Sequence, residues 1–199
     1  VDRSTYDRNR ETIENENTHV ICCLNTDRIC LFTDAGVLHQ VKVTDIPLGK
    51  LRDKGTPIDN LCKFDGTKEQ TVFVTNASSL QGKLFLFATR DAMLKRVPGE
   101  EFETNNRMVA ATKLQEGDSL VSVQPADEAS EVVLQTDNGV FLRFAMDEIS
   151  VQKKNARGVR GIKLGRGEAL EQVYLLGANT ESVITYKEKQ VHLNRLKQG

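Results

Sequence analysis

A strand–turn–strand unit recurs about every fifty residues in this 199-residue chain. Leu31–Val41 and Val133–Phe144 align through a shared Thr-Asp-X-Gly core, and two weaker copies lie at Leu86–Arg96 and Val183–Leu193. The threonines of the four copies stand at positions 33, 89, 136 and 185, so the steps are 56, 47 and 49 residues. A period of this size in a strand-rich chain is typical of the blades of a propeller-like array. The repeat therefore predicts an all-β fold.

The turn inside each unit indicates a hairpin. Gly36 and Gly139 can supply the positive φ that a tight hairpin needs. In the second copy we expect Asp91 to take this conformation, because aspartate tolerates the left-handed region better than most residues. The fourth copy reads Glu188-Lys189-Gln190 and has no glycine, so its turn is the least defined.

Two further strands are expected after each hairpin. A short strand ending in leucine is predicted at Thr56–Leu61, Val109–Leu114 and Arg160–Leu164. A third strand is predicted at Thr71–Val74, Ser119–Val123 and Glu171–Leu176. His19–Leu24 is expected to be the third strand of a unit whose hairpin lies upstream. We therefore expect residues 1–199 to form a single domain of about four blades, with almost no helix, as a fragment of a longer subunit.

Signals for catalysis, metal binding or membrane insertion are weak. No apolar run approaches the roughly 18 residues that a membrane-spanning helix needs. The chain contains no CxxC pair, and its four cysteines are expected to be buried, reduced thiols, which is typical of a cytoplasmic protein. These cysteines are Cys22, Cys23, Cys30 and Cys62. His19, His39 and His192 share no ligand spacing, so we expect no metal, no cofactor and no catalytic residue.

The charge distribution points to phosphate recognition. The net charge is only −1, whereas a dedicated nucleic-acid binder is usually basic. Yet Val151–Gly167 holds six basic residues and no acidic one, and its glycines would let the backbone approach a phosphate. Cations such as Lys42 and Arg52, taken alone, are better explained as parts of solvated loops.

Basic residues also recur at the end of the second hairpin strand or in the linker after it, which would line them along a rim of successive blades. The candidate DNA-binding residues are Lys54, Lys95, Arg96, Arg107, Arg143, Lys153, Lys154, Arg157, Arg160, Lys163 and Arg166.

Three segments make the resemblance to a known family specific. Asn155–Leu164 resembles the repeat signature in the C-terminal domain of the A subunit of bacterial type IIA topoisomerases, DNA gyrase and topoisomerase IV. Phe87–Pro98 and Lys54–Ile58 resemble two other segments of the same domain. The resemblance implies a β-pinwheel, a propeller-like ring of four-stranded blades that exchange strands. It also implies a noncatalytic domain that binds and bends double-stranded DNA along its perimeter.

The same resemblance implies partners: the ATPase B subunit of the enzyme, together with the remaining domains of the A subunit. The catalytic tyrosine and the ATPase would lie elsewhere. One departure matters, because gyrase carries a glycine-rich basic heptapeptide that supports DNA wrapping, and the corresponding segment here is Asn9–Asn15, with two acids and no glycine. The chain therefore resembles topoisomerase IV, or a gyrase-like paralogue with weakened wrapping, more than a typical gyrase.

Three functions stay open at this point. The first is a domain that presents a crossing duplex to the cleavage core for decatenation or relaxation. The second is a gyrase-type domain that wraps DNA for negative supercoiling. The third is a protein-interaction propeller without DNA binding, which the absence of tryptophan and an aromatic content of 6% disfavour.

Overall fold

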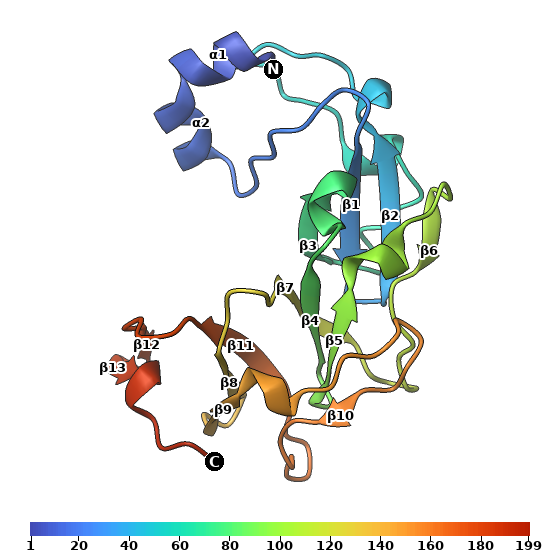
Figure 1. Ribbon diagram of the computed structural model, residues 1–199. Helices are drawn as coiled ribbons and strands as arrows, with labels where there is room; N and C mark the ends of the chain where they lie inside the picture. Colours follow the sequence, from blue (N-terminus) through green and yellow to red (C-terminus); the bar gives the residue numbers. More distant parts are fainter.

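The computed structural model describes residues 1–199 and confirms the all-β prediction for most of the chain. Four sheets follow one another along an open arc (Figure 1). The first blade has the strand order β3 (Thr71–Asn76), β1 (Arg28–Thr33), β2 (Val37–Lys42) and β6 (Met108–Ala110). The second blade has the order β10 (Val159–Arg160), β5 (Met93–Pro98), β4 (Leu84–Thr89) and β7 (Leu120–Pro125).

The last two sheets have fewer strands. The third blade consists of β11 (Leu170–Leu176), β8 (Glu131–Thr136) and β9 (Phe141–Ala145), and the fourth of β12 (Val183–Tyr186) and β13 (Lys189–His192). Short 3₁₀ turns link the strands: η1 (Val43–Asp45), η2 (Ile58–Asn60), η3 (Ala77–Leu80), η4 (Gly99–Phe102), η5 (Met146–Glu148) and η6 (Leu193–Arg195). The four predicted hairpins and the three predicted third strands are all present.

Outer strands are exchanged between neighbouring repeats. β6 follows β5 in the chain but pairs with β2 of the first blade, where Val37 faces Ala110. β10 follows β9 but pairs with β5 of the second blade, where Val159 faces Leu94. At the third blade the C-terminal residues repeat only the contact that precedes β10: Gly199 N–H donates to Arg143 O at 2.9 Å, as Gln152 N–H does to Arg96 O. The second and third repeats thus supply the outer edge of the blade before them, as the family resemblance implied.

The hairpin turns share one geometry in the first three blades. The third residue after the threonine has a positive φ, which is 73° at Gly36, 60° at Ala92 and 80° at Gly139. Its N–H donates to the threonine carbonyl in each case, at 2.9–3.0 Å. The expectation for Asp91 is therefore wrong, because this hydrogen bond places the left-handed residue one position later, at Ala92.

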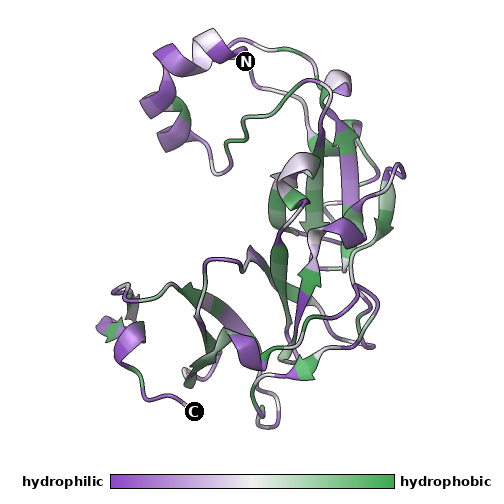
Figure 2. Ribbon diagram, viewed as in Figure 1, coloured by the Kyte–Doolittle hydropathy of each residue, from purple (hydrophilic) through white to green (hydrophobic).

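Apolar side chains from adjacent blades form the core. Between the first and second blades, the Phe32 ring lies 5.9 Å from Phe87 and 5.1 Å from Phe102, both edge to face. Between the second and third blades, Leu94 and Leu134 are fully buried in one cluster. Figure 2 shows hydrophobic residues concentrated in the strands of the blades and hydrophilic ones in the N-terminal helices. Burial between blades, more than within one sheet, holds the arc together.

The N-terminal segment departs from the sequence prediction. Residues 1–16 form α1 (Arg3–Arg8) and α2 (Arg10–Glu16), and His19–Leu24 is not a strand. Asp2 caps α1 by accepting a hydrogen bond from Thr5 N–H at 2.8 Å. Arg3–Asp7 and Arg10–Glu14 are ion pairs at i,i+4 spacing, which favours helix.

Two smaller expectations also need correction. The strand expected at Thr56–Leu61 is replaced by η2, because proline at position 57 cannot donate to a ladder. All four cysteines are free, but Cys22 is exposed rather than buried, and Cys23 and Cys62 are half-buried. No helix of the structure has the length and apolar character needed to cross a membrane.

Candidate nucleic-acid interface

Three equivalent segments carry the basic residues, and we call them crossovers. Each contains a leucine at the same position of its repeat. The first crossover (residues 46–63) contains Leu61, the second (102–116) Leu114, and the third (149–166) Leu164. The second and third include β6 and β10, which lie on the outer side of the arc (Figure 1). A cation stands seven residues before each leucine: Lys54, Arg107 and Arg157. All three side chains are exposed.

Charge differs sharply among the three crossovers. The third carries six cations and no acid, whereas Arg107 and Lys113 of the second are balanced by Glu103 and Glu116. The first holds four cations and two aspartates. Positive charge is therefore concentrated on the third crossover instead of being spread evenly along the rim.

The cations of the third crossover are accessible. Lys153, Arg157, Arg160, Lys163 and Arg166 are exposed and Lys154 is half-buried. None of them takes part in an ion pair of the structure. Lys54 on the first crossover is likewise exposed and has no carboxylate partner. Unpaired cations on a fixed backbone are what a phosphate backbone contacts.

Glycines fix the third crossover against β5. Gly158 has φ of 88°, and a Cβ added there would lie 2.6 Å from the carbonyl oxygen of Leu94. A Cβ at Gly161 would collide with the side chains of Leu94 and Leu134. Gly158 and Gly161 thus serve close packing within the protein, whereas nothing lies within 4 Å of a Cβ added at Gly167, where the approach of a phosphate stays a prediction.

Two of the candidate residues are not available to DNA in this structure. Lys95 is 3% exposed, and its ammonium donates hydrogen bonds to the carbonyls of Ala156, at 2.7 Å, and of Lys154. The Arg143 side chain is 19% exposed and pairs with Glu131 at 2.7 Å. Both residues stand on the second strand of a hairpin, where the neighbouring repeat covers them, so their charge is used inside the fold.

Two other candidates are partly engaged. The Nε of Arg96, which is half-buried, donates to the carbonyl oxygen of Ile149 at 2.6 Å. Arg107 is exposed but forms an ion pair with Asp45 at 3.0 Å. The recurrence of cations at strand ends therefore does not by itself mark a binding rim.

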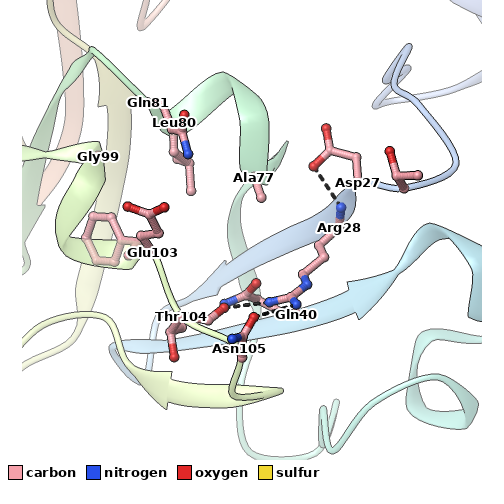
Figure 3. A pocket seen from close by; sticks show the side chains of 12 residues that line it. Asp27, Arg28, Gln40, Ala77, Leu80, Gln81, Gly99, Glu103, Thr104 and Asn105 are labelled. Carbon is pink, nitrogen blue, oxygen red and sulfur yellow. Dashed lines mark hydrogen bonds between the residues drawn. The ribbon is translucent and has the colours of Figure 1, made fainter.

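The strand-end arginines have a common structural role at the seams between blades. At the seam of the first and second blades, Arg28 donates to the carbonyl oxygen of Thr104 at 2.6 Å and to the amide oxygen of Asn105 at 2.8 Å (Figure 3). These groups line a polar hollow of about 330 Å³. Arg96 reaches Ile149 O at the next seam, and Arg143 reaches Asn194 O at 2.7 Å at the last. Each guanidinium joins a blade to the next repeat.

Sequence reasoning missed exposed cations of the crossovers, namely Lys63 on the first and Lys113 on the second. Lys113 on the second crossover is exposed and takes part in no ion pair. It stands one residue before Leu114, just as Lys163 stands before Leu164. Aligning the crossovers on their leucines would have found it.

A cluster of three buried polar residues, Thr33, His39 and Glu69, lies in the first blade. Glu69 accepts hydrogen bonds from Thr33 Oγ1 at 2.7 Å and lies 2.8 Å from His39 Nε2. Burial opposes ionisation of Glu69, but the hydrogen bonds from Thr33, Asp65 and His39 together outweigh it and hold the pKa below its ordinary value. His39 is 1% exposed. The group stabilises the sheet and offers no reactive surface.

Comparison with known proteins agrees with this architecture. The family model described as "DNA gyrase C-terminal domain, beta-propeller" matches residues 83–127 and 130–176, the second and third repeats. The chain belongs to the family of the C-terminal domains of type IIA topoisomerase A subunits. It is 32% identical over 157 residues to the DNA gyrase A subunit of Lawsonia intracellularis, a match that covers 78% of this chain and 19% of that protein. The chain thus spans about a fifth of the length of this relative.

Solved structures share the fold. The C-terminal domain of a DNA topoisomerase IV matches with a TM-score of 0.86 at 22% identity, over 99% of this chain and 64% of the other. A DNA gyrase A C-terminal domain matches with a TM-score of 0.60 at 18% identity, over 86% and 56%. At these identities the likeness concerns the fold alone.

Proposed function

We propose that this chain is a noncatalytic accessory domain that binds and bends double-stranded DNA for a bacterial type IIA topoisomerase. The observation that carries the proposal is the third crossover, whose cations are unpaired and held on the outer side of the arc by the pairing of β10 with β5. Lys54 and Lys113 extend the cationic surface to the other two crossovers. A duplex that follows the outside of an arc must bend, and additional phosphate contacts offset that cost.

A matched pair of substitutions tests DNA binding. Arg157 and Arg107 occupy the same position of adjacent repeats, but only Arg107 has a carboxylate partner. We expect Arg157→Gln to weaken binding of a short fluorescent duplex about three- to tenfold. The salt slope, by which we mean the steepness of log affinity against log salt concentration, should fall by about one. Arg107→Gln should stay within about twofold, because its charge is already neutralised. Absence of duplex binding at low salt, relative to a neutral control protein, would refute the proposal.

The proposed role in the cycle is presentation of the crossing duplex for decatenation or relaxation, as in topoisomerase IV. In support, Asn9–Asn15 lies largely within α2 and carries Glu11 and Glu14, which would repel a phosphate. The alternative is gyrase-type wrapping for negative supercoiling, which the sequence relatives favour. Ligation of nicked plasmid in the presence of the chain distinguishes them, since wrapping leaves chiral writhe in the closed product and simple binding leaves none.

The partners proposed with this function are the ATPase B subunit, together with the remaining domains of the A subunit, in the bacterial cytoplasm.

A protein-interaction propeller without DNA binding is the second candidate. It would use exposed apolar residues, and those on the blades, such as Met108, Val140 and Val151, are scattered singly. Salt-insensitive capture of a protein partner by an Arg157→Gln variant would favour it.

A further inference from the structure

Lys95 lies beneath the third crossover rather than on the surface. It stands in β5, and its ammonium donates to the carbonyls of Lys154 and Ala156. A buried ammonium is costly unless hydrogen-bond acceptors replace its water, and two carbonyls do so here. No carboxylate lies within ion-pair distance of it. The lysine is therefore committed to the backbone of the segment above it.

The geometry of that segment follows from these bonds. The N–H of Ala156 donates to Lys153 O at 3.0 Å and closes a turn. Exposure alternates along the turn: Lys153, Asn155 and Arg157 are exposed, while Lys154 and Ala156, whose carbonyls face Lys95, are half-buried. Drawing these two carbonyls inward leaves the cations of Lys153 and Arg157 outside.

Neighbouring contacts fix the two ends of the turn. On one side, Gln152 N–H donates to Arg96 O at 2.8 Å. On the other, Val159 pairs with Leu94 at the start of β10. Between these ends, Lys154 N–H donates to Glu101 at 3.2 Å and Gly158 N–H donates to Gln152 at 3.1 Å. The other hydrogen bonds that fix the turn to the sheet come from Lys95.

The other repeats lack this arrangement. Counted six residues after the repeat threonine, the equivalents of Lys95 are His39, Leu142 and Val191. His39 bonds to Glu69, and Leu142 packs against the core of the second and third blades. A lysine at this position thus occurs only under the crossover that carries six cations and no acid.

We propose that Lys95 is a positioning residue for DNA binding, which orients Lys153 and Arg157 toward the duplex without touching it. This inference rests on the proposed function of the third crossover. It predicts that loss of a buried charge weakens DNA binding through the residues above it. It also predicts that the loss of an exposed lysine elsewhere has a smaller effect.

A double-mutant cycle on the full chain tests the proposal. Lys95→Met is expected to weaken binding of a short fluorescent duplex about three- to tenfold and to lower the salt slope by about one to two. Lys153→Ala with Arg157→Ala should weaken it more, about ten- to a hundredfold, because both cations are lost. Adding Lys95→Met to that pair should then change affinity less than twofold, because the groups it positions are gone. Fully additive effects, or unchanged binding by Lys95→Met, would overturn the proposal.

The controls separate this inference from a loss of stability and from the proposed function. Lys83→Met removes the same charge from an exposed, unpaired position outside the crossovers and should change affinity less than Lys95→Met does. If Lys95→Met does not fold, Lys95→Arg serves instead, because it keeps a hydrogen-bond donor in place. The affinity of Lys95→Arg for the duplex should stay within about twofold of the parent's. The amide hydrogens of residues 153–158 should then exchange with solvent as slowly as in the parent. Loss of affinity with unchanged exchange would overturn the proposal. If Arg157→Gln also leaves binding intact, DNA binding at this crossover itself fails, which is a different outcome.

Discussion

The second and third crossovers have the same architecture, but the second has no net charge and the third is strongly basic. Each sends a short strand back to the preceding blade, β6 to β2 and β10 to β5, and each ends at an equivalent leucine, Leu114 or Leu164. Yet Ala110 and Glu116 of the second stand where Arg160 and Arg166 stand in the third. Strand exchange therefore fixes where a crossover lies, while a few exposed positions set its charge. The two properties can be changed separately.

The largest expected effect concerns how closely each crossover approaches its sheet. Gly158 has positive φ and lies against Leu94 O, whereas its equivalent, Met108, has negative φ and an exposed side chain. We expect Gly158→Ala to cost about 3 kcal/mol of unfolding free energy, or about 6–12 °C in Tm. Met108→Ala should cost about 1 kcal/mol or less. Equal thermal shifts for the two variants would show that the crossovers pack alike.

The next effect is a pH dependence confined to the third crossover. Burial lowers the pKa of Lys95 to about 8, and the charge of Glu101 opposes this only in part. Because the unfolded chain holds this proton up to about pH 10.5, it binds more protons than the folded chain between pH 8 and 10.5. Stability relative to Lys95→Met should therefore rise by about 1–3 kcal/mol across that window. Denaturant titrations at about pH 7.5 and 10 measure it, and a constant difference would contradict it.

The smallest effect is a transfer of charge to the neutral crossover. Ala110→Arg with Glu116→Arg raises the second crossover to four cations and leaves Glu103 as its one acid, so duplex affinity should rise about tenfold and the salt slope steepen by about one to two. Ala178→Arg with Glu128→Arg adds the same charge at exposed positions off the crossovers and serves as the control. An equal gain in both variants would mean that net charge matters, not its place.

Much of the fold follows from local sequence. The threonine and the turn after it predicted the hairpins, because strand alternation and a positive φ are encoded within a dozen residues. The helices α1 and α2 carry local signals too, in the Asp2 cap and the i,i+4 pairs of Arg3 and Arg10. They lie outside the fifty-residue repeat, which predicts strands and no helix. Strand exchange, in contrast, joins residues such as Val37 and Ala110 and entered only through the family resemblance.

The site was less predictable than the fold. Six cations without an acid predicted the third crossover as the candidate site, because that signal is contiguous in sequence. The burial of Lys95 and the pairing of Arg143 depend on the next repeat covering the strand, and partners such as Ala156 and Glu131 are not marked in the local pattern. A basic residue on a hairpin strand is thus ambiguous until the neighbouring repeat is placed.

The exchange of β6 has a consequence for how this protein is made. During synthesis the hairpin of the first blade is complete once Lys42 has been added. Its outer strand begins only at Met108, after the hairpin of the second blade has been synthesised. A nascent chain must therefore carry a sheet whose outer edge at β2 is unpaired while the next unit emerges from the ribosome. Two adjacent units should then lock in a single cooperative step, and pairing over such long separations in sequence makes that step slow.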